Sequence, residues 1–534
     1  MPTDPPTGDA AGGTTGGDDA GATADDTDHG AGERADAAVL QDLLDDLLVQ
    51  DVDRHERALA ELADIGDERV VAHLVDAATL HAVASDWENL GFPEVFRDRD
   101  PPYAFQHPET RFPGVVDALC AIADPDFDQP GVAWLQWESW YTQTDPETLE
   151  GYVDWKVRFY RTYHPTVGHL LDADPKHPDF DGVRWGSTDP TVLHPLNYPA
   201  WTTDDAHLEP DDDVYGFRVD GDAYAVPRYL LFPHEFANFD LGGERLALSY
   251  CTMCNSPVLY DATVENGSVG GPRQFASTGC LWNGNKLMYD EETLTLWNQQ
   301  TGTPVAGPDY ERHRDRRDAD EDGIALDFRP VTQTTWRDWR DDHPESATLA
   351  PDTGYDLDYA FYRDYDGFVK RHYWENDDVF HPGVRAESSA LDDRTYVYGV
   401  DAADGLHAYP VDAVHEGWPV ADEVDGRRVV ALPFDGDVAV YEAPDAPLSR
   451  DDVGDGNGWG GETVLVDGEG RRWTPTHDAL VPEGGRDDEG ASIRDRVLGR
   501  HGLWLAFRPH YDTVHVAGTD SPAPPASDDE VGDR

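Results

Sequence analysis

The sequence has very little lysine. Four of its 40 basic side chains are lysines (Lys156, Lys176, Lys286 and Lys370), against 108 aspartates and glutamates, so the formal net charge is −68. An acidic, lysine-poor chain is typical of halophilic proteins, because in molar salt the Debye length falls to about 3 Å and carboxylate repulsion is screened. The alternative is an acidic surface that binds a basic partner. That alternative is less favoured, because the acidic residues are spread along the whole chain and are not clustered. No basic patch is present to neutralise phosphates, which excludes nucleic acid as an expected partner.

Long apolar runs and a secretory signal are also missing. No run of 18 apolar residues occurs, so we expect no membrane span. The first 30 residues have neither a basic nor an apolar segment of the kind that directs export. Four cysteines in 534 residues are too few for a disulfide framework. Together these absences predict a cytoplasmic protein.

The length predicts two or three domains. The two ends of the chain contain few large apolar side chains. Residues 1–36 are therefore predicted to be a disordered acidic arm, and residues 519–534 a disordered tail. Apolar residues spaced by three and four predict a helical domain over 37–174, beginning with a HEAT-like hairpin around Gly66. Two aromatic stripes lie on its later helices and indicate core packing rather than a cofactor platform: Trp134, Trp137, Trp140, Tyr141, Trp155, Phe159, Tyr160 and Tyr163.

From residue 175 the composition favours strands between Gly, Asp and Pro turns. The predicted fold class is therefore α+β, with a β-rich core of two duplicated lobes at 175–350 and 395–518, joined by a linker at 351–394. Residues 395–416 repeat the plan of 213–235, and VLVDGEGRRWT repeats that of LMYDEETLTLWN. Trp297 and Trp473 should thus occupy equivalent places, in a second lobe that has lost the cysteines. The charged segment 311–323 is predicted to be a solvated loop.

Three of the four cysteines lie within residues 249–300: Cys251, Cys254 and Cys280. Strands are expected at 246–250, 257–261 and 286–289, so the Cys-x-x-Cys pair follows a strand. A four-cysteine zinc site would need a second pair, and a c-type haem would need a histidine where Asn255 stands.

Several kinds of site remain open at this pair. One is a mixed Cys/His site for a transition metal (zinc, copper or iron), with His234 as the third ligand and Cys280 or another histidine as the fourth. The others are a dithiol/disulfide redox pair, an inert structural disulfide, and two cysteines that only pack in the core. A thioredoxin-type pair opens a helix, whereas Pro257 predicts a strand after this one, which favours metal over redox chemistry.

Residues 249–300 resemble the core motif of the family of domain of unknown function 3179, which runs from a cysteine pair to FxxSGxLxNxxLxMYDxxTxSLWxQxxG. The loop 234–239 resembles the family's HE-x-x-ND loop, with Phe239 in place of the usual Asp. The resemblance implies a polar ligand-binding group for a small molecule, formed by Thr278, Asn283, Tyr289, Asp290, Trp297 and Gln299. It implies no reaction, because the family has no settled activity.

Two hypotheses of different class follow. The first is a metal- or thiol-dependent protein centred on Cys251 and Cys254. The second is a non-catalytic binding or interaction module, with an unknown small molecule or protein as partner, in which the cysteines serve packing only. The sequence contains no G-x-S-x-G nucleophile elbow and no phosphate-binding loop, so it supports no third hypothesis of a serine hydrolase or a nucleotide-binding protein.

Overall fold

A computed structural model describes most of the chain between residues 34 and 517. The described ranges are 34–85, 108–123, 134–144, 146–186, 194–319, 321–375, 383–384, 389–434, 437–450, 465–483 and 493–517. The predicted acidic arm (nearly all of it) and the predicted tail lie outside these residues. Helices come first along the chain, followed by a strand-rich core of several sheets, so the predicted α+β class is confirmed.

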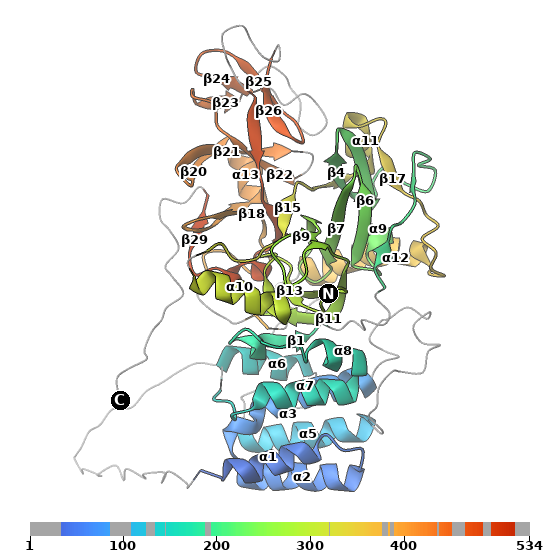
Figure 1. The fold of residues 1–534 in the computed structure, drawn as a ribbon, viewed down its shortest axis with the longest axis vertical. Helices are drawn as coiled ribbons and strands as arrows, with labels where there is room; N and C mark the ends of the chain where they lie inside the picture. Colours follow the sequence, from blue (N-terminus) through green and yellow to red (C-terminus); the bar gives the residue numbers. More distant parts are fainter. Residues whose placement is uncertain are drawn as a thin grey trace, which may run out of the picture.

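The helices stack at one end of the molecule, below the sheets in Figure 1. They are α1 (Ala37–Asp46), α2 (Val52–Ile65), η1 (Glu68–Val70), α3 (Val71–Ser85), α5 (Pro108–Ala123), α6 (Trp134–Thr144), α7 (Tyr152–Tyr163) and α8 (Pro165–Leu170). The Asp51 side chain caps α2 at the Arg54 N–H, and Gly66 ends this helix with a left-handed φ of 68°. None of the described helices has both the length and the apolar character needed to cross a membrane.

The aromatic stripes of α6 and α7 form the centre of the helical core, as predicted. Trp155 stacks on Phe159 with ring centroids 4.8 Å apart. Trp137, Tyr160 and Tyr163 are also buried in this cluster. The helices therefore hold together by apolar burial, which stabilises them by about 1.5–3 kcal/mol for each large side chain.

Buried charges join the helical domain to the strands above it. The Lys156 ammonium lies 3.4 Å from a carboxylate oxygen of Asp76, and the Tyr152 hydroxyl donates to the same carboxylate at 2.6 Å. Arg184, on the first strand, lies 3.3 Å from Glu138 of α6. The first two contacts join α7 to α3 within the helical domain. Because unpaired charges are costly in a dry interior, the Arg184–Glu138 pair then fixes how this domain meets the sheets.

The first β lobe contains three five-stranded sheets and one two-stranded sheet. Its elements are η2 (Phe180–Gly182), β1 (Val183–Trp185), β2 (Leu196–Asn197), β3 (Trp201–Thr202), β4 (Asp213–Val219), β5 (Asp222–Pro227), α9 (Arg228–Leu231), β6 (Phe236–Leu241), β7 (Glu244–Cys251), β8 (Ser256–Asp261), β9 (Thr263–Val264), β10 (Gly271–Pro272), β11 (Phe275–Trp282), β12 (Asn285–Asp290), β13 (Leu296–Asn298), β14 (Pro304–Ala306), α10 (Pro308–Asp318), β15 (Asp327–Arg329), β16 (Thr332–Thr335), α11 (Trp336–Asp342) and β17 (Ala347–Leu349). The strand orders are β1-β11-β12-β13-β14, β15-β8-β7-β6-β2, β16-β4-β5-β17-β3 and β10-β9. The three strands predicted around the cysteines are β7, β8 and β12.

The second lobe, orange to red in Figure 1, contains two sheets. Its elements are β18 (Tyr396–Ala402), β19 (Gly405–Pro410), α13 (Val411–Gly417), β20 (Val420–Val424), β21 (Arg427–Phe434), β22 (Asp437–Glu442), β23 (Leu448–Arg450), β24 (Leu465–Asp467), β25 (Arg472–Pro475), β26 (Ala479–Pro482), β27 (Arg494–Val497), β28 (Arg500–Leu503), η4 (Trp504–Ala506), η5 (Arg508–His510) and β29 (Val514–Val516). The strand orders are β28-β18-β19-β29 and β20-β21-β22-β27-β26-β25-β24-β23.

Much of the strand order is the same in the two lobes. The set β16-β4-β5-β17 corresponds to β28-β18-β19-β29, and in both sets the last strand runs parallel to its neighbour. The meander β6-β7-β8 followed by β15 corresponds to β20-β21-β22 followed by β27. The Trp297 indole donates to Asp290 at 2.9 Å, and the Trp473 indole donates to Asp467 at 3.1 Å. Each tryptophan therefore lies on a strand that pairs with the strand just before it, and its indole donates to the aspartate that ends that preceding strand.

Two segments differ from the sequence prediction. The stretch 351–394, predicted as a linker, contains α12 (Tyr359–Val369) and η3 (Lys370–Trp374), which bury Tyr362 and Trp374 against the first lobe. The segment 311–323, predicted as a loop, is largely the helix α10. Asp309 and Glu311 in its first turn and Arg316 in its last turn favour the helix dipole.

Candidate functional site

Cys251 ends β7, and Cys254 lies in the tight turn before β8. The two cysteines form a disulfide, with Cα atoms 5.2 Å apart. Their exposed fractions are 2% and 0%. A strand follows the pair, as predicted from Pro257, so no helix N-terminus is available to stabilise a thiolate here.

The disulfide turn is a junction between separate parts of the chain. The Trp374 indole of η3 donates to the Thr252 carbonyl at 2.7 Å. The Leu503 amide of β28, in the second lobe, donates to the Cys254 carbonyl at 2.9 Å. The Asn285 side-chain amide donates to the Cys254 sulfur at 3.6 Å. A conformational change in this turn would therefore break hydrogen bonds to both lobes and to η3.

A buried amide network lies beside the disulfide. The Gln299 amide group donates to the Ser249 hydroxyl at 3.1 Å and to the Ser256 carbonyl at 2.9 Å, while its oxygen accepts from Asn285 at 3.1 Å. The Gln300 amide donates to the Ser256 hydroxyl at 2.7 Å. Gln299, predicted as a ligand-binding residue, thus has its hydrogen-bonding groups engaged inside the protein.

The four predicted metal ligands are not brought together. His234 has both ring nitrogens engaged, at 2.7 Å from the His194 carbonyl and 2.7 Å from the Tyr359 hydroxyl, and burial lowers its pKa to about 4. Cys280 lies on β11 and packs in the helical-domain core, where burial raises its pKa to about 12. Within the described part of the chain these two residues, Cys251 and Cys254 do not form a group of converging ligand atoms.

The predicted ligand-binding residues mostly serve the strands that carry them. The Thr278 hydroxyl donates to the Leu287 carbonyl at 2.6 Å, across a bulge between β11 and β12. Asp290 accepts from Trp297, as described above. Asn283 occupies the β11–β12 turn with a φ of 46°, and Tyr289 is half-buried on β12. A ligand-binding role for this set stays a prediction.

A buried trio beside these strands was missed. Lys286 on β12 makes an ion pair with Glu235, and its ammonium lies 3.1 Å from the Ser277 hydroxyl. The Ser277 hydroxyl donates to Glu235 at 3.2 Å. Burial lowers the pKa of Lys286. The signal in the sequence was a lysine inside an otherwise buried strand, in a chain with only four lysines.

The trio allows a test of its contribution to stability. We expect Lys286→Met to destabilise the protein by about 3–5 kcal/mol, because Glu235 would remain as a buried charge without its partner. Urea unfolding in high salt would measure the loss. The double variant Lys286→Met/Glu235→Leu should regain a large part of it, since both charges are then gone. Equal stability of the single variant and the parent would contradict a buried ion pair.

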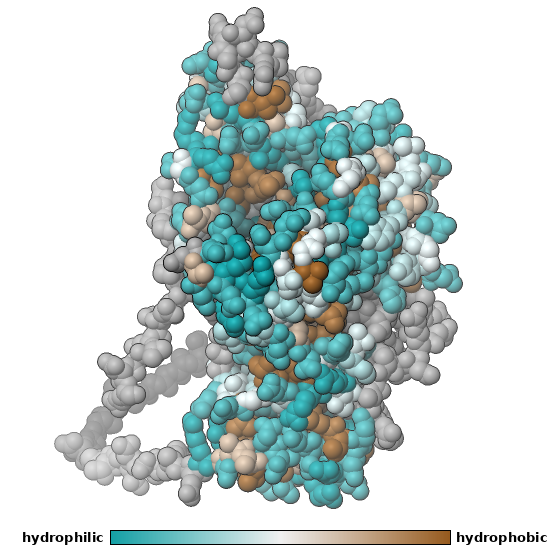
Figure 2. All heavy atoms as spheres, in the orientation of Figure 1, coloured by the Kyte–Doolittle hydropathy of each residue, from teal (hydrophilic) through white to brown (hydrophobic). Residues whose placement is uncertain are grey.

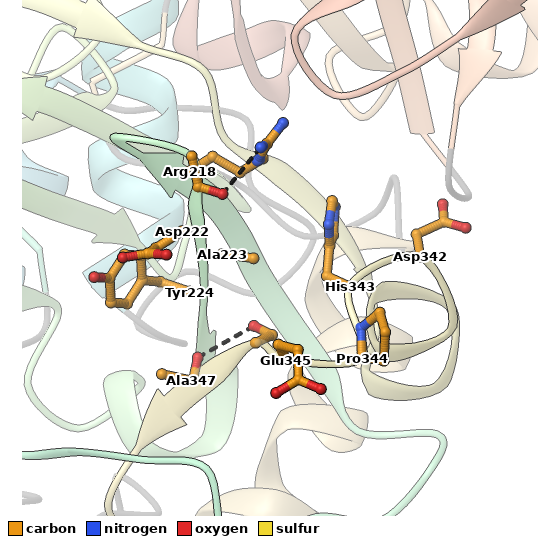
Figure 3. Close-up of a pocket in the computed structure, with 11 residues that line it drawn as sticks. Arg218, Asp222, Ala223, Tyr224, Asp342, His343, Pro344, Glu345 and Ala347 are labelled. Atoms are coloured by element: carbon orange, nitrogen blue, oxygen red, sulfur yellow. Dashed lines mark hydrogen bonds between the residues drawn. The ribbon is translucent and has the colours of Figure 1, made fainter.

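A surface hollow lies in the first lobe, between the β4–β5 hairpin and the segment after α11 (Figure 3). Its volume is about 410 Å³. The charged and aromatic side chains that line it are Arg218, Asp222, Tyr224, Asp342, His343 and Glu345. Arg218 makes an ion pair with Asp478 of the second lobe, so the carboxylates leave the hollow acidic.

Comparison with known proteins finds one relationship. Residues 190–509 match the sequence profile described as a protein of unknown function, DUF3179. The matched range includes most of both β lobes and excludes the helical domain. No curated protein and no solved structure gives a significant match.

Proposed function

The chain belongs to the DUF3179 family of proteins of unknown function, and we propose that it is a thiol–disulfide redox protein whose reversible couple is Cys251–Cys254. The observation that carries the proposal is the disulfide formed across a single turn. Reduction would transfer two electrons and two protons from an external dithiol, break the bond between the sulfurs, and leave two thiols and an oxidised reductant.

The residues around the cysteine pair support a redox couple whose exchange with external thiols is restricted. The amide of Asn285 donates to the Cys254 sulfur, and this hydrogen bond would stabilise negative charge there during exchange. The hydrogen bond from Trp374 to Thr252 holds η3 over the turn. Since both sulfurs are almost fully buried, exchange requires that this cover opens.

The same burial favours a second function. A disulfide that no reductant reaches acts only as a structural crosslink, and the protein is then a non-catalytic binding module. The two candidate functions differ in whether the native protein exchanges its disulfide.

We also infer that the second lobe is a duplicated copy of the first without the cysteines. The shared strand order and the matching pairs Trp297–Asp290 and Trp473–Asp467 support this inference. The counterpart of the β7–β8 turn lies between β21 and β22. The copy therefore supplies a scaffold of the same plan with no thiol chemistry of its own.

Reduction kinetics test the redox function. We expect dithiothreitol to reduce the native disulfide slowly, and Trp374→Ala to accelerate reduction at least tenfold, because the cover over the turn is removed. Alkylation followed by mass spectrometry of the peptide with Cys251 and Cys254 would give the rate. Trp418→Ala, in the second lobe, is the matched control and should leave the rate unchanged.

The outcome also separates the two candidate functions. A redox couple equilibrates with a thiol buffer while the far-UV circular dichroism of the protein stays native. If both the parent and Trp374→Ala are reduced only after unfolding, the disulfide is structural and the binding-module function stands. Cys251→Ser should abolish the couple, whereas Cys120→Ser, which alters a cysteine outside the pair, should retain it.

A further inference from the structure

Two histidines and two aspartates gather at one edge of the second lobe, far along the chain from the cysteines. Strand β19 runs parallel to β29, and the register places His407 directly opposite His515. Asp404 lies in the hairpin turn just before β19, and Asp422 lies on β20. The pairing of these strands therefore brings together residues more than 100 positions apart.

Three of these side chains converge on one point. The Nε2 atom of His407 lies 3.3 Å from one oxygen of Asp404, and the Nε2 atom of His515 lies 3.4 Å from the other oxygen. The two imidazole rings are stacked with centroids 4.6 Å apart. One ligand atom from each of the three residues lies within 4.8 Å of the other two. Two imidazoles and one carboxylate form a common ligand set for divalent transition metals.

Asp422 orients the buried histidine. Its carboxylate lies 3.0 Å from Nδ1 of His407 and accepts a hydrogen bond from the Tyr409 hydroxyl at 2.9 Å. A carboxylate on Nδ1 holds the proton there and turns the lone pair of Nε2 towards Asp404. Metal-bound histidines in proteins almost always have such a partner on the second ring nitrogen.

The site is held firmly on one side and open on the other. His407 is 3% exposed, whereas the side chains of His515 and Asp404 are 30% and 61% exposed. Gly405 has a φ of 129°, and a Cβ atom there would lie 2.3 Å from the Thr513 carbonyl. This close approach fixes the hairpin against the chain entering β29. The Nε2 atom of His515 is itself buried, so solvent reaches the site beside the exposed Asp404 carboxylate and can supply the remaining ligands there, as in metal sites with three protein ligands.

The first lobe shows that the sheet does not require these residues. In the corresponding pair of strands, Tyr224 lies opposite Ala347. These two residues line the surface hollow of the first lobe (Figure 3). The histidines of the second lobe are thus an addition to a shared framework, and packing alone does not account for them.

We propose that Asp404, His407 and His515 bind a divalent transition metal ion, with Asp422 as the outer partner that orients His407. The chemical class is a first-row ion that accepts nitrogen and oxygen ligands, and Zn²⁺ is the probe. This site is separate from the cysteine pair and does not depend on the redox function proposed above.

Calorimetric titration of the chelator-treated full-length protein with Zn²⁺, in molar NaCl with excess Mg²⁺ to occupy weak carboxylate sites, tests the proposal. We expect one tight site. His407→Ala and His515→Ala should each weaken it at least 100-fold, and Asp422→Asn should weaken it about 10- to 100-fold. His343→Ala, which changes a histidine of the first-lobe hollow, is the matched control and should bind as the parent does.

The variants distinguish a metal ion at this site from one bound elsewhere in the chain. Cys251→Ser should retain the tight site, and loss of binding in that variant would place the metal at the cysteines and overturn the proposal. The absence of any tight site, or a site unaffected by His407→Ala, would also overturn it and leave His407 as a ring held between two carboxylates. Circular dichroism of each variant in high salt confirms that the second lobe is folded before titration.

Discussion

Transfer from about 2 M KCl to about 10 mM salt is expected to abolish the cooperative unfolding transition of this protein. The net charge is −68, and two of the four lysines, Lys156 and Lys286, are buried and cannot neutralise surface carboxylates. The face seen in Figure 2 is mainly hydrophilic. The Debye length rises from about 3 Å at 1 M to about 30 Å at 0.01 M, so carboxylates across a whole domain then repel one another.

Thermal melts followed by far-UV circular dichroism at several salt concentrations would measure this effect. We expect the transition to weaken below a few tenths molar and to return when salt is restored. Sucrose at matched osmolality is the control, since it favours compact states without screening charge. Superimposable melts in molar and dilute salt would contradict the halophilic character proposed for the chain.

Acidification from pH 7 to pH 5 in high salt is expected to destabilise the helical domain by at least about 4 kcal/mol, the share of two buried histidines. His55 and His73 are fully buried, and their ring nitrogens have no hydrogen-bond partner among the described residues. Burial lowers the pKa of both to about 3, from an ordinary value of 6.5. His73 lies between the rings of Tyr152 and Trp155, at 4.8 and 4.9 Å, where a charged imidazole would lose its water.

The direction follows from proton uptake. Below pH 6.5 the unfolded chain binds a proton at each histidine, whereas the folded domain binds none until the pH approaches 3. The stabilising contribution is therefore complete above pH 6.5 and decreases by about 1.4 kcal/mol per histidine for each pH unit below it. Two histidines over one and a half pH units give the expected 4 kcal/mol.

Urea unfolding followed at 222 nm, at pH 7 and pH 5, would measure the change. The double variant His55→Phe/His73→Phe has no imidazole to protonate at these positions, so about 4 kcal/mol of the difference between the two pH values should disappear, while the part due to His81 remains. Equal stability of the parent at both pH values would show that these histidines are not held neutral by burial.

The two proposed sites lie in different lobes and use different chemistry. The disulfide turn of the first lobe contacts β28 through Leu503, and β28 pairs with β18, which pairs with β19 of the proposed metal site. The lobes are thus joined at the thiol site, while the Asp404 carboxylate of the proposed metal site is largely exposed to solvent. The experiments above treat each site separately, so failure of one proposal leaves the other unaffected.

Local patterns in the sequence determined much of the architecture. The helical hairpin around Gly66, the aromatic helices and strands β7, β8 and β12 could all be predicted, because helical and strand periodicity and turn residues act over a few positions. The Cys-x-x-Cys spacing allowed a disulfide, and the similar segments around Trp297 and Trp473 predicted a duplication, which remains a proposal. Charge composition and the family motif were also available without a structure.

Contacts between distant segments were decided only by the tertiary structure. His234 is engaged by the His194 carbonyl and by Tyr359 of α12, and neither partner could be identified from residues near it. Lys286 meets Glu235 across 51 positions, although the strands beside them, β12 and β6, belong to different sheets. His407 meets His515 through strand pairing across 108 positions. Such contacts depend on which sheet faces are buried against each other. The free energy of that burial comes from distant segments, so no local sequence pattern predicts it.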